Sequence, residues 1–272
     1  MATESILLPT GVTVEYELVG PPGAPVVCFV HGLGAAMEQF EPQVDCFSGR
    51  YRVLRLSHRG HGRSGQAPTS EPEAYTPRAL AEDLRALLGE LRIDEPHFVG
   101  NSLGGLVGYE LLKAGQPRLR SLTTFGTTAE LHTSKAKYWM LVGSIRLFGM
   151  LFGNNAMASL LEKTGSRDRE VGAILKRMFL FARQDALTLL AKSIANYDYT
   201  SVLSAADVPV LLIRGGLDKE INATLSSTLA VIDRLPHGRV VSLADAGHYA
   251  NMDEPDAFNR VIEGFLEEIP CD

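Results

Sequence analysis

The chain has 272 residues, of which 45% are hydrophobic and 21% charged, and it carries a formal net charge of −6 at pH 7. This composition is typical of a folded protein with a sizeable core and excludes an intrinsically disordered chain. The acidic balance and the lack of a basic run argue against a nucleic-acid partner.

Short apolar runs alternate with helical patterns along most of the chain. Val12–Leu18 alternates as a half-exposed strand does, whereas Val26–Val30 is continuously apolar, as buried parallel strands are. Further strands are expected at Tyr51–Leu56, His97–Gly100, Leu122–Phe125, Val208–Arg214 and Arg239–Leu243, and helices at Pro77–Leu91, Leu103–Ala114, Ala223–Leu235 and Pro255–Glu268. The alternation predicts an α/β fold, in which helices cover both faces of a mostly parallel sheet with an antiparallel edge.

The alternation stops between Thr127 and about Thr200, where helical stretches follow one another without a convincing strand. V-P-V-L-L-I-R-G then resumes the sheet at Val208. We therefore expect a core domain made of residues 1–126 and 201–272. Residues 127–200, here called the cap segment, would form a helical lid over the carboxyl ends of the strands, where active sites of such sheets lie.

Ser102 stands between glycines in G-N-S-L-G-G, directly after one expected strand and directly before a helix. This is the context of a nucleophile elbow, in which a sharp turn lifts a serine hydroxyl above the sheet. The alternative is that Ser102 only caps the helix, a common role for serine.

A serine nucleophile needs a histidine to take its proton and a carboxylate to orient that histidine. His248 follows the last expected strand, and Asp218 follows the strand before it, so both lie at the carboxyl edge of the sheet. The chain order of Ser102, Asp218 and His248 is the one expected for an elbow of this kind. Glu220, Asp245 and Asp253 are alternative candidates for the acid. His248 could also be an ordinary loop residue, and Asp218 could have a purely structural role.

An attacked carbonyl develops negative charge, which two backbone N–H groups can stabilise. We expect one from Leu103, immediately after the nucleophile, and the other from Leu33 in H-G-L-G. The alternative for this glycine-rich segment is a plain tight turn.

Four motifs together resemble the α/β-hydrolase superfamily over nearly the whole chain outside the cap segment. They are H-G-L-G at 31, G-N-S-L-G-G at 100, G-G-L-D at 215 and G-H at 247. The resemblance implies an eight-stranded-type sheet and places the chain near serine esterases, enol-lactonases and C–C bond hydrolases. S-H-R-G-H-G-R-S at 57–64 is similar to a D-x-R-G-x-G-x-S stretch of these relatives, but has Ser57 where many carry Asp. A serine at the elbow argues against dehalogenases and epoxide hydrolases, which use an aspartate there.

The cap segment contains an apolar stretch at 138–153 that has no polar face when it is wound as a helix. One side would pack on the core and the other would line an apolar pocket. The candidate pocket residues are Trp139, Met140 and Leu147, joined by Met178, Phe179 and Phe181 from R-M-F-L-F-A. The alternatives are a helix buried between neighbours and, less favoured because a basic face is missing, a membrane contact.

The sequence therefore predicts a serine hydrolase that cleaves a carboxylic ester or lactone with an apolar acyl or ring moiety, through an acyl-enzyme on Ser102. The alternatives are a C–C bond hydrolase, a cofactor-free perhydrolase or haloperoxidase, and a receptor with little turnover. No metal-ligand or nucleotide motif occurs, so we expect no cofactor and no partner beyond substrate and water.

The three widely spaced cysteines favour reduced thiols, and residues 1–11 lack the basic start and apolar run of a signal peptide. The longest apolar run is too short to cross a bilayer. We expect a cytoplasmic protein without a membrane span.

Overall fold

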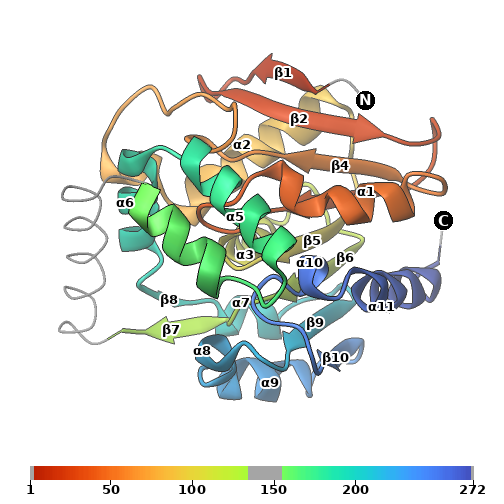
Figure 1. The fold of residues 1–272 in the computed structure, drawn as a ribbon. Coiled ribbons are helices and arrows are strands. Elements are labelled where there is room, and N and C mark those ends of the chain that lie inside the picture. The colour runs from red at the N-terminus through yellow and green to blue at the C-terminus, as the bar shows by residue number, and fades with distance from the viewer. Residues whose placement is uncertain (1–2, 134–154, 271–272) are drawn as a thin grey trace.

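The computed structural model describes residues 3–133 and 155–270. Within them, eight strands form one sheet in the order β1-β2-β4-β3-β5-β6-β9-β10 (Figure 1). Their bounds are β1 Glu4–Leu7, β2 Thr13–Val19, β3 Val26–Val30, β4 Arg52–Leu56, β5 His97–Asn101, β6 Ser121–Phe125, β9 Val210–Gly215 and β10 Gly238–Leu243. β2 pairs antiparallel with β1 and β4, and the other pairings are parallel. The predicted mostly parallel sheet with an antiparallel edge is confirmed.

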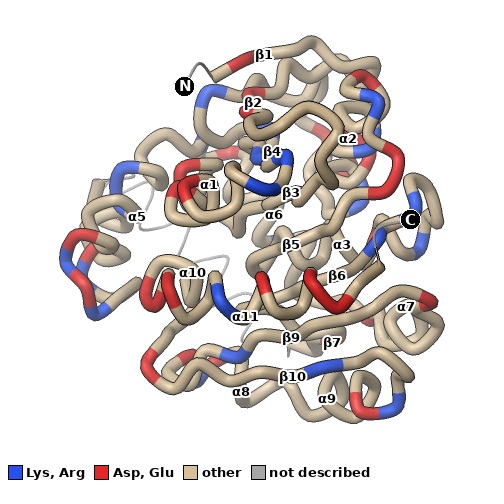
Figure 2. The backbone as a smooth tube through the Cα atoms, turned by 90° about the vertical axis from the view of Figure 1, so that its right-hand side faces the viewer, with Lys and Arg blue, Asp and Glu red and all other residues tan. Residues whose placement is uncertain are grey.

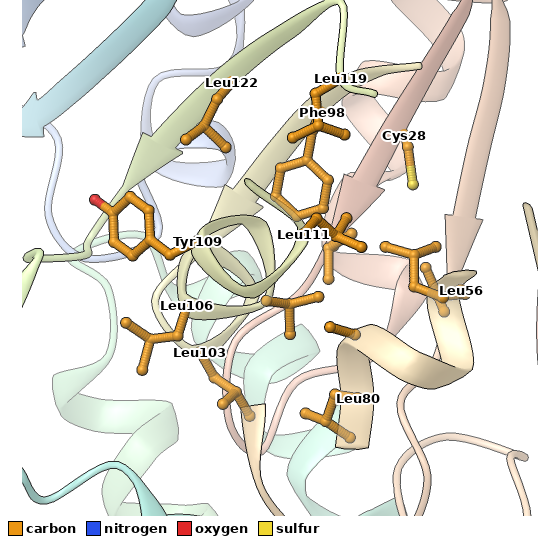
Figure 3. Close-up of a cluster of buried hydrophobic side chains, with 14 of the residues drawn as sticks. Cys28, Leu56, Leu80, Phe98, Leu103, Leu106, Tyr109, Leu111, Leu119 and Leu122 are labelled. Carbon is orange, nitrogen blue, oxygen red and sulfur yellow. The ribbon is translucent and has the colours of Figure 1, made fainter. Parts of the chain in front are cut away.

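Helices cover both faces of this sheet, as predicted (Figure 1). α1 (Glu41–Phe47) and α11 (Pro255–Glu267) pack on the face that carries Phe29 and Val99. The opposite face, with Cys28 and Phe98, is covered by α2 (Pro77–Glu90), α3 (Leu103–Ala114), α7 (Thr200–Ser204) and α9 (Ser226–Ile232). Figure 3 shows Phe98 and Leu122 of this second face lying against α3, with Leu111 of the helix beside Phe98. The continuous burial of β3 and β5 explains why their sequences are apolar on both sides.

The cap segment contains two short strands that the sequence analysis did not predict. β7 (Glu130–His132) and β8 (Asn196–Asp198) pair antiparallel with each other, at the two ends of the segment. Between them, residues 155–164 are helical and are followed by α5 (Arg169–Phe181) and α6 (Gln184–Ser193).

The remaining described elements are short helices at the edges of the sheet. They are the 3₁₀ helices η1 (Met37–Phe40) and η2 (Pro72–Ala74), and the α-helices α8 (Lys219–Asn222) and α10 (Ala250–Asp253). None of the helices within the described ranges combines the length and apolar character that crossing a bilayer requires. Figure 2 shows acidic and basic residues interspersed along the chain, with both signs present on α11.

Candidate active site

Ser102 lies on a strained turn between β5 and α3. Its φ of 51° and ψ of −114° fall in a region that non-glycine residues rarely adopt. A Cβ on Gly100 would lie 2.6 Å from the backbone of Gly104, and one on Gly104 would overlap the carbonyl of Val30. The two flanking glycines are therefore required by close backbone contacts. Since the Ser102 side chain makes no hydrogen bond that caps α3, its hydroxyl is available for other chemistry.

His248 and Asp218 form a hydrogen-bonded pair. The Nδ1–H of His248 donates to Asp218 Oδ2 over 2.7 Å, and the Asp218 side chain is 8% exposed against 31% for that of His248. With the proton on Nδ1, Nε2 of the neutral ring carries the lone pair that a general base needs. Asp218 follows β9, and its Oδ1 also accepts from the N–H of Ile221 at the start of α8.

The competing acids lie in different surroundings. Glu220 and Asp245 are exposed. The oxygens of Asp253 accept instead from the Gly247 N–H over 2.8 Å and from the Ser166 hydroxyl over 2.5 Å. Among these candidates the structure pairs Asp218 with the histidine.

Backbone contacts bring the serine and histidine loops to one edge of the sheet. The N–H of Ser102 donates to the carbonyl of Phe125, and Asn101 Nδ2 donates both to that carbonyl and to the carbonyl of His248. A Cβ on Gly126, the next residue after Phe125, would lie 3.0 Å from Cε1 of the His248 ring. The three chain segments therefore meet where β5, β6 and β10 end.

Leu33 and Leu103 present backbone N–H groups that have no hydrogen-bond partner within the described part of the chain. A Cβ on Gly32 would lie 3.2 Å from that of Ser102, so the two segments are in contact. The carbonyl of Gly32 accepts from His31 Nδ1 over 2.7 Å and from the Ala35 N–H over 3.2 Å. Because the N–H and C=O of a trans peptide point in opposite directions, these bonds turn the Leu33 N–H away from them. The arrangement is suited to binding an oxyanion.

Comparison with known proteins places this geometry in a family. The model of the α/β hydrolase fold family matches residues 25–255. The chain belongs to the α/β-hydrolase fold family. The family resemblance and the prediction of a hydrolytic enzyme are thereby confirmed.

Relatives of this α/β hydrolase are enzymes named for hydrolysis. 3-Oxoadipate enol-lactonase 1 of Acinetobacter baylyi is 26% identical, and the match covers 95% of each chain. The proposed carbamate hydrolase RutD of Pseudomonas syringae pv. syringae is 29% identical over 94% of this chain and 99% of its own. The crystal structure of the enol-lactonase from Burkholderia xenovorans LB400 superposes with a TM-score of 0.83 at 25% identity, over 97% of this chain and 100% of that one.

The predicted pocket residues of the α/β hydrolase fall into three groups. Trp139, Met140 and Leu147 lie outside the described residues. Met178 is buried in a cluster with Ala35, Ala36, Val171, Leu175, Tyr249 and Met252. Phe181, the last residue of α5, is 62% exposed and does not join that cluster.

The junction of α5 and α6 rests on the loops that surround the site. A Cβ on Gly34 would lie 2.8 Å from the ring of Phe179 and 3.7 Å from Leu187. The N–H of Arg183 donates to the carbonyl of Gly60 over 2.8 Å, and Ala186 packs against the same glycine. The cap segment therefore contacts the loop that carries the Leu33 amide.

A cavity of about 1350 Å³ opens beside the acid–histidine pair. Asp218, His248 and Tyr249 form one side, and residues 161–169 of the cap segment form another. Most of the residues that line it have charged or polar side chains, and Leu161, Leu217 and Ile221 add apolar surface. Within the described ranges no three potential ligands gather in a way that would hold a metal ion.

Three buried histidines behind the Leu33 loop were not predicted from the sequence. His31 Nε2 accepts from the N–H of His58 over 2.9 Å, and His61 Nε2 accepts from the N–H of Gly34 over 3.1 Å. The ring centroid of His31 lies 4.3 Å from that of His58 and 5.3 Å from that of His61. Burial lowers the pKa of His58 to about 3 and that of His61 to about 4, and it places the pKa of His31 well below its usual value. These rings are thus neutral supports for the loop.

Acid should destabilise the fold through this cluster. A histidine in the unfolded chain has a pKa near 6.5, so below that pH the unfolded state binds more protons than the folded state. The stability that neutral His58 and His61 contribute is therefore complete above pH 6.5. It is lost as the pH falls toward their pKa values in the folded protein, about 3 and about 4. Between pH 7 and pH 5, His58 and His61 should each remove about 2 kcal/mol from the free energy of unfolding.

Urea denaturation at pH 5, 6 and 7 measures this dependence. The matched variant is His61→Gln, whose amide oxygen retains an acceptor for the Gly34 N–H but cannot be protonated in this range. Its free energy of unfolding should fall less steeply than that of the wild type. Equal slopes for the two proteins would contradict the assignment.

Proposed function

We propose that this α/β hydrolase cleaves carboxylic esters or lactones through an acyl-enzyme formed on Ser102. The observation that carries the proposal is the 2.7 Å bond between His248 and Asp218, at the same sheet edge as the strained Ser102. The enol-lactonase names of the relatives support this reaction class.

The first half of the reaction forms the acyl-enzyme. His248 Nε2 takes the proton of the Ser102 hydroxyl as the oxygen attacks the carbonyl carbon of the substrate. The negative charge that develops on the carbonyl oxygen is bound by the N–H groups of Leu33 and Leu103. Asp218 stabilises the imidazolium, which then gives its proton to the departing alcohol, or to the ring oxygen of a lactone.

The second half of the reaction releases the acid. His248 removes a proton from water, the resulting hydroxide attacks the acyl carbon, and the same two amides bind the second oxyanion. The proton returns from His248 to Ser102, which restores the resting enzyme. Every step uses protein groups and water alone.

The cap segment is proposed to act as the lid that selects the substrate. Phe179 of α5 and Leu187 of α6 lie against Gly34 of the Leu33 loop, and Met178 is buried in the same cluster as Tyr249. The apolar stretch at 138–153 favours a substrate with an apolar acyl or ring moiety. The charged cavity beside His248 is suited to the polar side of such a molecule, or to its leaving group.

A substrate panel tests the proposal. p-Nitrophenyl esters of graded chain length, an enol-lactone and a dienoate substrate of C–C bond hydrolases are assayed side by side. We expect turnover of esters or the lactone, together with labelling of Ser102 by a fluorophosphonate, as located by mass spectrometry. Turnover of the dienoate alone, or labelling at another residue, would contradict the proposal.

A further inference from the structure

A network of buried carboxamide side chains runs beneath the candidate site. Its members come from η1, α1, the end of β5, α10 and α11, and they are at most 7% exposed. They are Gln39, Gln43, Asn101, Asn251 and Asn259. Buried amides are costly unless their hydrogen bonds are satisfied, so a set of this size in a core calls for a specific role.

The inner part of the network joins three loops of the site. Gln39 Nε2 donates to Asn101 Oδ1 and to Asn251 Oδ1, each over 3.1 Å. Asn101 Nδ2 donates in turn to the carbonyl of His248, over 3.1 Å. Gln39 Oε1 accepts a long bond of 3.5 Å from the N–H of Gly32. One side chain thereby contacts the residue before the nucleophile, the residue before the Leu33 amide and, through Asn101, the histidine loop.

Backbone groups fix the direction of every amide in this inner part. The nitrogen of Asn101 faces the carbonyls of Phe125 and His248, so its oxygen must face Gln39. The nitrogen of Asn251 faces the backbone carbonyl of Gln39 over 2.8 Å, which directs its oxygen to the Gln39 side chain. The network therefore has one self-consistent orientation, and it cannot be rearranged without leaving a buried group unpaired.

The outer pair, Gln43 and Asn259, offers the same chemistry and joins the inner part only at Asn251, through Gln43. Gln43 Nε2 donates to Asn259 Oδ1 over 2.9 Å, and Asn259 Nδ2 donates to the carbonyl of Pro42 over 3.3 Å. Asn259 touches none of the three loops through these bonds. It is a buried amide of matched type for comparison.

We propose that Gln39 and Asn251 are positioning residues, which hold the oxyanion amides, the nucleophile and the histidine in register for catalysis. This inference rests on the function proposed above. Without Gln39, the oxygens of Asn101 and Asn251 lose their common donor. The Asn101 side chain then rotates so that its oxygen can accept a hydrogen bond from another group. That turn releases the carbonyl of His248, so the histidine and the serine lose their relative position.

The test compares Gln39→Met, which keeps the length of the side chain, with Asn259→Leu. Because small displacements of reacting groups are costly, Gln39→Met should lower kcat for ester hydrolysis by about 10–100-fold and change KM by less than about threefold. The rate of fluorophosphonate labelling at Ser102 should fall in parallel. Asn259→Leu should change kcat by less than about threefold while lowering the melting temperature at least as much.

Asn251→Ala provides a second route to the same measurement. It removes both bonds between the Asn251 side chain and Gln39, together with the bond from Asn251 Nδ2 to Gln43 Oε1, and it leaves Gln39 in place. It should show the same selective loss of kcat. If all three variants lower the melting temperature alike and retain kcat, the network is only structural and the proposal fails. If Gln39→Met and Asn251→Ala do not fold whereas Asn259→Leu does, the proposal fails as well, because the inner amides then hold the fold.

The wild type and Ser102→Ala separate this inference from the proposed function. Ester hydrolysis by the wild type that disappears in Ser102→Ala upholds the proposed function, whatever Gln39→Met does. Hydrolysis that survives in Ser102→Ala overturns the function and, with it, the positioning role.

Discussion

Ser102→Ala should lower kcat for ester hydrolysis by about 10⁴–10⁶-fold, because it removes the oxygen that forms the acyl bond. What rate remains would come from the amides of Leu33 and Leu103 and from substrate binding. The fold should be retained, since the Ser102 side chain makes no bond that caps α3. Alanine also tolerates the φ of 51° no worse than serine does.

The measurement is steady-state hydrolysis of a p-nitrophenyl ester, with circular dichroism to verify folding. Ser121→Ala is the matched control, since Ser121 is a buried serine at the start of β6 that contacts His97. The control should keep kcat within about threefold of the wild type. Near-wild-type hydrolysis by Ser102→Ala, with the protein folded, would remove the nucleophile assignment.

The sequence alone located the elements whose signals are local. β3 and α3 were predicted with the bounds that the structure shows, Val26–Val30 and Leu103–Ala114. The apolar run of β3 is buried on both faces, and α3 ends at Gly115, whose φ of 67° is typical of a helix C-cap.

Elements without a periodic pattern were missed. β7 and β8 are three residues long, too short for alternation to be visible, and they form only by pairing with each other across the cap segment. α1 has seven residues, and its buried positions face α11 from the far end of the chain. α9 ends at Ile232, three residues before its predicted end, because the chain turns there toward β10. Such short elements depend on tertiary contacts more than on propensity.

The candidate site divides in the same way. Ser102, Asp218 and His248 each follow a strand within a few residues. The strands predicted from the local sequence therefore suffice to place all three at the carboxyl edge of the sheet. The support behind them is invisible locally, since Gln39 and Asn251 are 212 residues apart and His31 and His58 are 27 apart. The pocket role of Phe181 stays a prediction, because R-M-F-L-F-A is apolar on more than one helical face and nothing in it says which face meets the core.

Asp218→Asn should lower kcat by about 10⁴-fold while leaving KM nearly unchanged. The asparagine amide can donate to Nδ1 of His248, which moves the ring proton to Nε2 and removes the lone pair that accepts the Ser102 proton. The variant also lacks the negative charge that stabilises the imidazolium. Both losses arise in the transition state, so they appear in kcat.

The control for Asp218→Asn is Asp245→Asn. Asp245 is an exposed acid on the same loop as His248, and the sequence analysis names it as an alternative to Asp218 for the acid that orients the histidine. The Asp245→Asn variant should keep kcat within about threefold of the wild type, because removing an exposed charge perturbs the site only weakly. If Asp245→Asn lost activity while Asp218→Asn kept it, the acid of the triad would be misassigned. Loss of the helix cap would not explain a slow Asp218→Asn variant. Asparagine caps helices as well as aspartate does, and it retains an oxygen that accepts from the Ile221 N–H. A folded Asp218→Asn protein that binds substrate but turns it over slowly would therefore locate the defect in the charge and tautomer of the pair.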